Sequence, residues 1–113
     1  FQARIADQFK VGLVVLLGDA AHMTPPFAGQ GMNAGIRDTH NLAWKLALVC
    51  KGIASPAVID SYEVERREPT WAMIQLAVAM GEVVMPVGPS GQTLRDALVE
   101  GLAKFPGARD YFV

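Results

Sequence analysis

The sequence predicts a mainly α-helical chain with one or two short β-strands near its start. Three features of the 113 residues indicate this class. The apolar run Leu13–Leu17 is short and contains two valines, which is typical of a strand buried on both faces. A loop rich in glycine and proline follows it. From Gly31 onward apolar residues recur at helical spacing, so helices are expected to dominate.

The segment 1–18 is predicted to hold the strands. Rough alternation of apolar residues over Phe1–Phe9 favours an edge strand or the last stretch of a crossover that enters the domain. The residues Lys10–Gly12 are expected to turn into the buried strand at Leu13–Leu17, which Gly18 ends.

Residues 19–30 form the predicted loop, and Asp19 stands at its start. A side chain just after a strand commonly reaches a ligand while the sheet holds its backbone. Alternatively, the Asp19 carboxylate caps the following turn. Pro25, Pro26 and Gly29 fix the shape of the loop in advance, although the two prolines alone could simply stop the chain before a helix.

Both histidines are expected to be structural. The near neighbours of His22 do not supply the acid and nucleophile of a triad, so we expect it to fix the loop rather than act as a base. His40 falls inside the predicted helix, as a packed or surface residue. No metal site is predicted, because one histidine does not make one.

The helix predicted over 31–51 opens with Gly31, Met32 and Asn33 and has no acidic cap. Its first N–H groups therefore have no partner inside the helix, and such an end attracts negative charge from a ligand. Lys51 and Gly52 are expected to end it.

The body of this helix is rich in apolar residues, which predicts burial on most sides. Arg37, Asn41 and Lys45 recur every four residues and mark one polar stripe. Asp38 either forms a solvated ion pair with Arg37 or pairs with another part of the domain.

The segment 55–113 is predicted to hold the remaining helices. Ser55 is a suitable N-cap, Glu63 and Arg67 are spaced to pair on an exposed face, and Pro69 is expected to kink or break the helix near Arg66. A helical pattern resumes at 71–84, and the residues 85–91 read as a loop. A further amphipathic helix is indicated by Leu94, Leu98, Leu102 and Phe105, with Pro106 and Gly107 ending it.

Composition gives no reason to expect nucleic acid or an anionic membrane as a partner, because the net charge is −1 and charged residues make up 19%. The mean hydropathy of +0.25 indicates a surface meant for a further domain. A single cysteine, Cys50, excludes an internal disulfide and predicts a cytoplasmic location. No apolar run reaches the roughly 20 residues that span a bilayer. Since the chain starts without Met or a signal-peptide pattern, we expect a piece of a longer protein.

One ordered set of motifs resembles a known family. The motifs are Gly18-Asp19-Ala20-Ala21-His22, Pro25-Pro26, Gly29-Gln30-Gly31-Met32-Asn33, Asp38 and Asn41-Leu42-Ala43-Trp44-Lys45-Leu46. Together they are similar to the second FAD-binding motif of the flavin-dependent aromatic hydroxylases, the p-hydroxybenzoate hydroxylase-like class A flavoprotein monooxygenases. Shorter matches at 61–67, 93–96 and 105–112 resemble the 3-(3-hydroxyphenyl)propionate hydroxylase subgroup.

The resemblance implies a C-terminal fragment of an α/β FAD-binding (Rossmann-like) domain. Its strands would occupy 1–18, the flavin loop 19–30, the flavin-facing helix 31–51 and the C-terminal helices 55–113. The cofactor-binding residues that it implies are Asp19, which would accept a hydrogen bond from a ribityl hydroxyl, and Pro26, Gly29, Gln30, Gly31, Met32 and Asn33. No catalytic side chain is implied, although the backbone of Pro26 could contribute. Ala28 stands where the family often has glycine.

The resemblance also implies an activity: FAD, reduced by NADH or NADPH, would react with O2 to give a C4a-hydroperoxide that hydroxylates a phenolic substrate. The N–H groups at the helix start would neutralise negative charge on the flavin. The first Gly-rich FAD fingerprint is absent from this chain, so we expect the missing N-terminal part of the enzyme as a partner and no hydroxylation or tight FAD binding by the fragment alone. The resemblance leaves room for a homo-oligomer.

Two alternatives remain. The same flavin fold could serve another FAD-dependent oxidoreductase, halogenase-like or dehydrogenase-like. The second alternative is a non-catalytic helical interaction module, whose helices would serve dimerisation.

Overall fold

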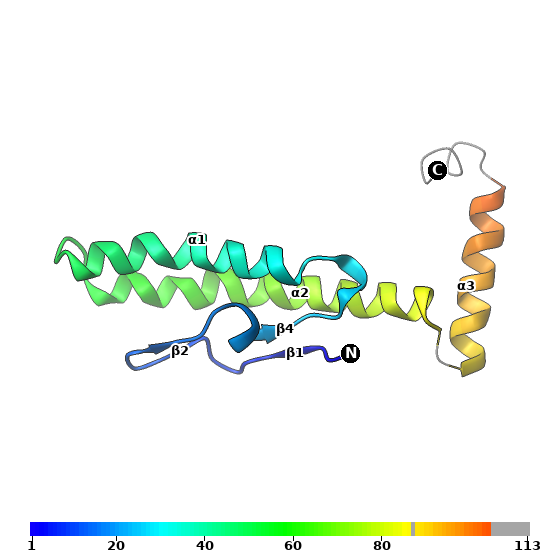
Figure 1. The fold of residues 1–113 in the computed structure, drawn as a ribbon, viewed down its shortest axis with the longest axis horizontal. Coiled ribbons are helices and arrows are strands. Elements are labelled where there is room, and N and C mark those ends of the chain that lie inside the picture. The colour runs from blue at the N-terminus through cyan, green and yellow to red at the C-terminus, as the bar shows by residue number, and fades with distance from the viewer. Residues whose placement is uncertain (87, 105–113) are drawn as a thin grey trace. The chain divides into compact units, whose positions relative to one another are not determined.

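The computed structural model describes residues 1–86 and 88–104, and Figure 1 shows their elements. The α-helices are α1 (Gly31–Cys50), α2 (Asp60–Val84) and α3 (Gly88–Ala103). The strands are β1 (Arg4–Ile5), β2 (Lys10–Val11), β3 (Val14–Val15) and β4 (His22–Met23). Short 3-10 turns are η1 (Gly18–Ala20), η2 (Pro26–Ala28) and η3 (Pro56–Ile59). The predicted class is thus confirmed, since helices dominate and every strand is two residues long.

The chain divides into two compact units, Phe1–Val78 and Ala79–Val113. The first unit contains all four strands, α1 and most of α2, and it carries every site residue predicted from the sequence.

The strands pair as two antiparallel ladders. In one, β1 pairs with β4, so that Ile5 lies opposite His22. In the other, β2 and β3 form a hairpin that turns at Gly12, whose φ is +58°. The prediction of a doubly buried strand over 13–17 is wrong, because Leu13 is fully exposed and β3 covers only two residues. The physical reason is that no second layer covers this hairpin within the described chain.

The core of the first unit lies where the strands meet α1 and α2. It consists of Phe9, Ala21, Leu42, Ile59 and Tyr62, which are all buried. The Phe9 ring lies 5.9 Å from the Tyr62 ring, and the Tyr62 hydroxyl donates a hydrogen bond to the carbonyl of Leu16. This core therefore joins residues far apart in the sequence.

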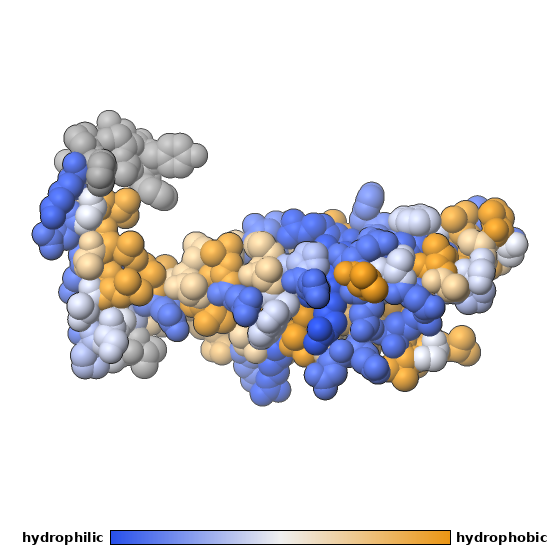
Figure 2. Space-filling view, turned by 180° about the vertical axis from the view of Figure 1, so that it is seen from behind, coloured by the Kyte–Doolittle hydropathy of each residue, from blue (hydrophilic) through white to orange (hydrophobic). Residues whose placement is uncertain are grey.

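Helix α1 buries one side only, which contradicts the expected burial on most sides. Its buried residues are Ala34, Asp38, Leu42 and Lys45, spaced by three or four as one helical face requires. Met32, Ile36 and Trp44 are at least half exposed. Figure 2 shows such apolar residues at the surface among polar ones. The face of α1 that packs against the unit is therefore mixed, with two apolar and two polar side chains.

The ends of α1 and the start of the next segment follow the predicted local chemistry. Gly52 has a φ of +68° just after the helix, and its N–H donates to the carbonyl of Val49. The Ser55 hydroxyl accepts a hydrogen bond from the N–H of Ala57 at 3.3 Å, as an N-cap does.

Helix α2 runs from Asp60 to Val84 with Pro69 inside it, so of the predicted kink or break the break is wrong. Its neighbours Arg66 and Thr70 make contacts that hold this turn to the rest of the unit. The predicted pair of Glu63 and Arg67 is also wrong. Glu63 Oε2 instead accepts from the backbone N–H groups of Phe9 and Lys10 at 2.8 and 3.1 Å, and Arg67 donates to the carbonyl of Ala6. Both side chains thus tie α2 to the strand segment.

Helix α3 begins at Gly88, inside the stretch predicted as a loop. Pro89 lies in its first turn, where proline needs no N–H partner. Apolar residues gather on one side of α3, among them Leu94, Leu98 and Leu102 (Figure 2). The predicted helix end at 105–107 lies outside the described residues. No single helix in 1–86 or 88–104 is long and apolar enough to cross a membrane, and α2 with α3 passes that test only as a bent pair, by length and composition.

Candidate cofactor-binding site

An open pocket of about 640 Å³ lies at the N-terminal end of α1. Its lining residues are Phe1, Gln2, Asp19, Met23, Thr24, Pro26, Gly29, Gly31 and Met32. Five of the seven residues predicted to bind a cofactor thus line one pocket: Asp19, Pro26, Gly29, Gly31 and Met32.

The loop that enters the pocket is fixed by its own backbone. Pro25 is buried, Pro26 starts η2, and the N–H of Gly29 donates to the carbonyl of Pro26 at 2.9 Å. Gly29 has a φ of +60°, which favours glycine, and a Cβ built there would meet nothing within 4 Å. Gly29 is therefore required by the bend of the chain and not by close packing against the protein.

The first turn of α1 presents unpaired backbone donors. Gln30 makes no side-chain cap, and its carbonyl accepts from the N–H of Ala34 at 2.8 Å. Within the described part of the chain, the N–H groups of Gly31, Met32 and Asn33 have no acceptor, and the first turn contains no acid. The partial positive charge of the helix start is thus not neutralised by those residues, and it lies at the pocket.

Asp19 lies in η1, is exposed, and lines the same pocket. Its carboxylate accepts no hydrogen bond from the described residues, so it does not cap the turn that follows. A carboxylate in this state can accept a hydrogen bond from a neutral hydroxyl of a ligand.

Gln30 and Asn33 differ from the other predicted residues because neither lines the pocket. The side-chain oxygen of Gln30 accepts from Arg37 at 3.1 Å, and the Asn33 side chain is exposed on the first turn. The structure therefore offers the backbone of Asn33, and not its side chain, as a donor near the pocket.

The sequence-based prediction missed four lining residues: Phe1, Gln2, Met23 and Thr24. The pairing of β1 with β4 brings the start of the chain beside the loop. No spacing in the sequence signals that pairing, since each strand has only two residues.

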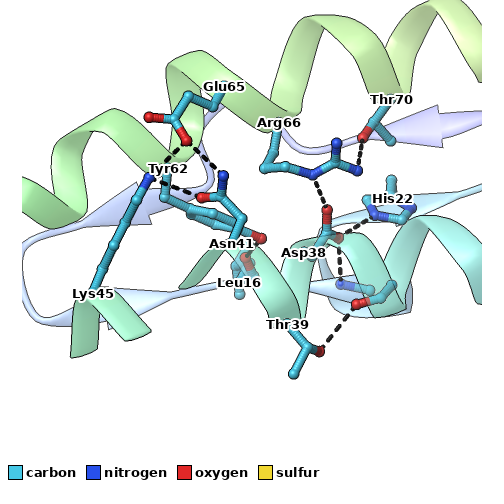
Figure 3. Close-up of polar contacts among 12 residues, drawn as sticks. Leu16, His22, Asp38, Thr39, Asn41, Lys45, Tyr62, Glu65, Arg66 and Thr70 are labelled. Carbon is cyan, nitrogen blue, oxygen red and sulfur yellow. Dashed lines mark hydrogen bonds and ion pairs between the residues drawn. The ribbon is translucent and has the colours of Figure 1, made fainter. Parts of the chain in front are cut away.

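A buried carboxylate contacts both ends of the turn that carries Asp19. Asp38 of α1 is fully buried, and its Oδ2 accepts from the N–H of Gly18 at 3.0 Å and from His22 Nε2 at 2.6 Å (Figure 3). Its Oδ1 accepts from Arg66 Nε at 2.8 Å, and Arg66 also reaches the Thr70 hydroxyl. Burial raises the pKa of Asp38, but the hydrogen bonds from His22, Arg66 and Gly18 outweigh it and hold the pKa below its usual value.

These contacts settle two alternatives from the sequence. Asp38 pairs with another part of the domain, through Arg66, and does not form a solvated pair with Arg37. His22 is buried and bound to Asp38, which confirms a structural role in fixing the loop, although its acid partner was not expected. His40 lies on the surface.

A second polar cluster, built around the buried Lys45, lies further along α1. Lys45 is 1% exposed, and its Nζ donates to Asn41, Ser61 and Glu65 at 2.9, 2.7 and 2.8 Å (Figure 3). The hydrogen bond from Lys45, followed by those from Asn41 and Ser61, lowers the pKa of Glu65 to about 2. This cluster joins α1 to α2 and does not reach the pocket.

Comparison with known proteins agrees with this geometry. Residues 1–77 match the family model described as FAD binding domain. The 3-(3-hydroxy-phenyl)propionate/3-hydroxycinnamic acid hydroxylase of Burkholderia cenocepacia is 50% identical over 110 residues, which covers 96% of this chain and 20% of that protein.

Solved structures show the same relation. CabE, an aromatic hydroxylase from angucycline biosynthesis, is similar with a TM-score of 0.76 and 39% identity over 87% of this chain and 20% of its own. The Diels-Alderase of pyrroindomycin biosynthesis has a TM-score of 0.75 and 32% identity over 97% of this chain and 23% of its own. The chain thus spans about a fifth of the length of such relatives. By the match over 1–77 and by the pocket at the start of α1, the chain belongs to the FAD-binding domain family.

Proposed function

We propose that this chain is the FAD-contacting part of an FAD-dependent monooxygenase that uses NADH or NADPH and hydroxylates a phenolic substrate. The observation that carries the proposal is the pairing of an exposed carboxylate, Asp19, with the acceptor-free amides at the start of α1, in one pocket. The similarity to 3-(3-hydroxy-phenyl)propionate hydroxylases supports a phenol with a short acidic side chain as the substrate class.

The residues of the pocket fit the chemical groups of FAD. Asp19 would accept a hydrogen bond from a ribityl hydroxyl, as a carboxylate accepts from a neutral alcohol. The N–H groups of Gly31, Met32 and Asn33 would stabilise negative charge on the isoalloxazine ring. A ring surface could approach the loop at Pro26 and Gly29, where no Cβ projects from Gly29. Gln30 holds Arg37 beside this loop and would shape its edge.

Bound FAD would supply the redox chemistry, taking electrons from the nicotinamide and passing them to O2. The contribution of this chain is to bind and orient the flavin and to match its charge. In the described residues Asp19 is the one ionisable side chain that lines the pocket, and the proposal gives it a binding role. The groups that bind the substrate and the nicotinamide are assigned to the rest of the enzyme.

The chain alone is proposed to neither hydroxylate nor hold FAD tightly. Its pocket is open, and the chain corresponds to about a fifth of the matching relatives. A small, open contact area buries too little of a ligand as large as FAD for tight binding.

The test uses the complete protein that carries this chain, purified and supplied with FAD, NADH or NADPH, O2 and 3-(3-hydroxyphenyl)propionate. We expect a yellow protein with a flavin absorption spectrum and a product that has gained one oxygen atom beside the phenolic hydroxyl. A folded protein that binds no flavin would contradict the proposal.

A second candidate is another reaction on the same FAD-binding fold. The similarity to a Diels-Alderase favours considering it, because that protein is named for a reaction without oxygen transfer. Here the protein would bind FAD but would not incorporate ¹⁸O from ¹⁸O2 into any of a panel of phenols. A non-catalytic helical module, in contrast, would fold and self-associate without flavin.

A further inference from the structure

The turn that carries Asp19 has almost no support of its own. Asp19 itself makes no hydrogen bond to the described residues, and η1 is closed by one backbone bond, from the N–H of Ala21 to the carbonyl of Gly18 at 2.9 Å. Gly18 adopts a φ of +56°, a conformation that L side chains rarely adopt. The direction of the Asp19 side chain must therefore be fixed from outside the turn.

Two groups outside the turn provide that support. The N–H of Ala6 donates to the carbonyl of Ala21 at 2.8 Å, and a single side-chain oxygen, Asp38 Oδ2, holds both ends of the turn. Asp38 Oδ2 accepts from the N–H of Gly18, just before Asp19, and from the ring of His22, just after the turn. Both ends of the segment 19–21 are thus held by the same atom (Figure 3). Because the Asp38 carboxylate is ionised and can only accept, His22 Nε2 is the donor. The other ring nitrogen of His22, Nδ1, is buried without a partner in the described residues, so the bond from Nε2 is the only hydrogen bond of the ring among them.

The position of Asp38 is fixed in turn by α2. Arg66 Nε donates to Oδ1 at 2.8 Å, and the carboxylate is fully buried, so it cannot exchange these donors for water. The backbone of the turn also lies directly on α1, since a Cβ built on Gly35 would be 3.5 Å from the Cα of Gly18. The turn, α1 and α2 therefore meet at this carboxylate.

We infer that Asp38 is a positioning residue for flavin binding, which holds the turn so that Asp19 faces the pocket. This inference rests on the proposed function, because it acts through the proposed contact of Asp19 with FAD. It assigns to the Asp38–His22–Arg66 cluster a role beyond stability, namely control of the affinity for the ribityl part of the cofactor.

The substitution Asp38→Asn tests this in the complete protein. An amide has one acceptor oxygen, whereas the carboxylate uses both of its oxygens, so one set of donors would face an NH2 group. We expect the dissociation constant for FAD to rise at least about tenfold, as for loss of a charged hydrogen bond at Asp19 itself.

A double-mutant cycle separates positioning from general damage. The cycle compares Asp19→Ala, Asp38→Asn and the double variant by titrating each apoprotein with FAD. If Asp38 acts through Asp19, the double variant binds FAD no more than about threefold more weakly than Asp19→Ala alone. The matched control is Glu65→Gln, which alters the other buried cluster of α1 and should change FAD affinity less than about twofold.

Two outcomes would contradict the positioning role while the proposed function stands, provided that Asp19→Ala itself weakens FAD binding. In the first, the double variant raises the dissociation constant by the product of the two single effects. In the second, Asp38→Asn raises it no more than Glu65→Gln does. If Asp19→Ala leaves FAD affinity unchanged, the proposed site is wrong and the positioning role with it. Should Asp38→Asn fail to fold, Arg66→Gln takes its place in the cycle with the same expectations, since it removes only the donor to Oδ1.

Discussion

The polar groups at the start of α1 lack hydrogen-bond partners among the described residues, whereas those in its middle have them. At the start, the N–H groups of Gly31, Met32 and Asn33 have no acceptor among the described residues and lie at an open pocket. In the middle, Asp38 and Lys45 are buried, and nearly every hydrogen-bonding group around them has a protein partner.

This difference shows which part of α1 fixes the helix to the rest of the protein and which part is open to a ligand. A buried charge is tolerated only when its partners are supplied by the protein, so the middle of α1 is committed to α2 and to the strand segment. The start of α1 is free to interact with a ligand because the middle holds the helix in place. The predictions below test the two regions against each other.

The largest effect is expected from Asp38→Ala. The change leaves Arg66, the N–H of Gly18 and His22 without their buried acceptor, and breaking such an ion pair costs about 3–5 kcal/mol. Urea unfolding of the complete protein measures this loss. His40→Ala is the control, because His40 is exposed on the same helix and should change stability by less than about 0.5 kcal/mol. Equal losses for the two variants would show that the middle of α1 is not a committed scaffold.

The next prediction concerns the start of α1. Met32→Pro removes one N–H group at a first-turn position where proline is tolerated, and Met32→Ala keeps that group while removing the same exposed side chain. A hydrogen bond to a charged group contributes about 1.5–3 kcal/mol. If this amide stabilises the reduced, anionic flavin, its loss lowers the two-electron reduction potential by about 30–60 mV.

The potentials of the two variants are measured by dye-coupled reduction of the holoprotein. Met32→Ala should keep the native potential to within about 10 mV, a few tenths of a kcal/mol. If Met32→Pro and Met32→Ala have the same potential, the start of α1 does not act on the charge of the flavin.

A smaller effect is expected from Lys45→Met, which keeps the apolar stem but loses three hydrogen bonds. We expect a loss of about 1–2 kcal/mol at neutral pH, because the Glu65 partner is half exposed and partly screened by solvent. The pKa of Glu65 is lowered to about 2, against about 4.3 in an unfolded chain. The contribution of ionised Glu65 to the free energy of unfolding is therefore complete above about pH 4.3 and is lost as the pH falls through about 2.

Unfolding midpoints in urea at pH 7 and pH 3 test this dependence. The deficit in stability of Lys45→Met, measured as the difference between its unfolding midpoint and that of the unaltered protein, should become smaller at pH 3. A deficit that stays constant would mean that the contact with Glu65 adds nothing to the hydrogen bonds with Asn41 and Ser61.

The features that the sequence predicted correctly depend on local chemistry. The helix over α1, its end at Gly52 and the N-cap at Ser55 each follow from residues within one turn. The same holds for the acceptor-free start of α1, since glycine, methionine and asparagine provide no acidic cap. The position of Asp19 in the pocket followed from the motif that resembles FAD-binding hydroxylases.

The features that the sequence did not predict depend on partners far along the chain. For Asp38 the sequence left open a solvated pair with Arg37 and a pair with another part of the domain, and it did not identify the partner Arg66, which lies 28 residues away. Lys45 reads as part of a polar stripe, yet one acceptor from α1 and two from α2 make its burial possible. Hydrophobic periodicity assumes that apolar residues face inward, whereas the buried face of α1 holds Asp38 and Lys45 beside Ala34 and Leu42.

The smallest expected effect compares Gly29 at the pocket with Gly35 within α1. Gly29→Ala forces alanine into a φ of +60° and should cost about 1 kcal/mol, although the new Cβ meets no protein atom within 4 Å. Gly35→Ala places a Cβ 3.5 Å from Gly18, an ordinary contact, and alanine is favoured over glycine in a helix by about 0.5–1 kcal/mol. The two changes should therefore shift the unfolding midpoint in opposite directions, and a Gly29→Ala protein as stable as the original would contradict the strained bend.

FAD titration of the same pair adds a second distinction. If Gly29→Ala lowers the free energy of FAD binding by more than it lowers the free energy of unfolding, the cofactor uses the open space over Gly29. If the two free energies fall equally, this glycine only shapes the loop.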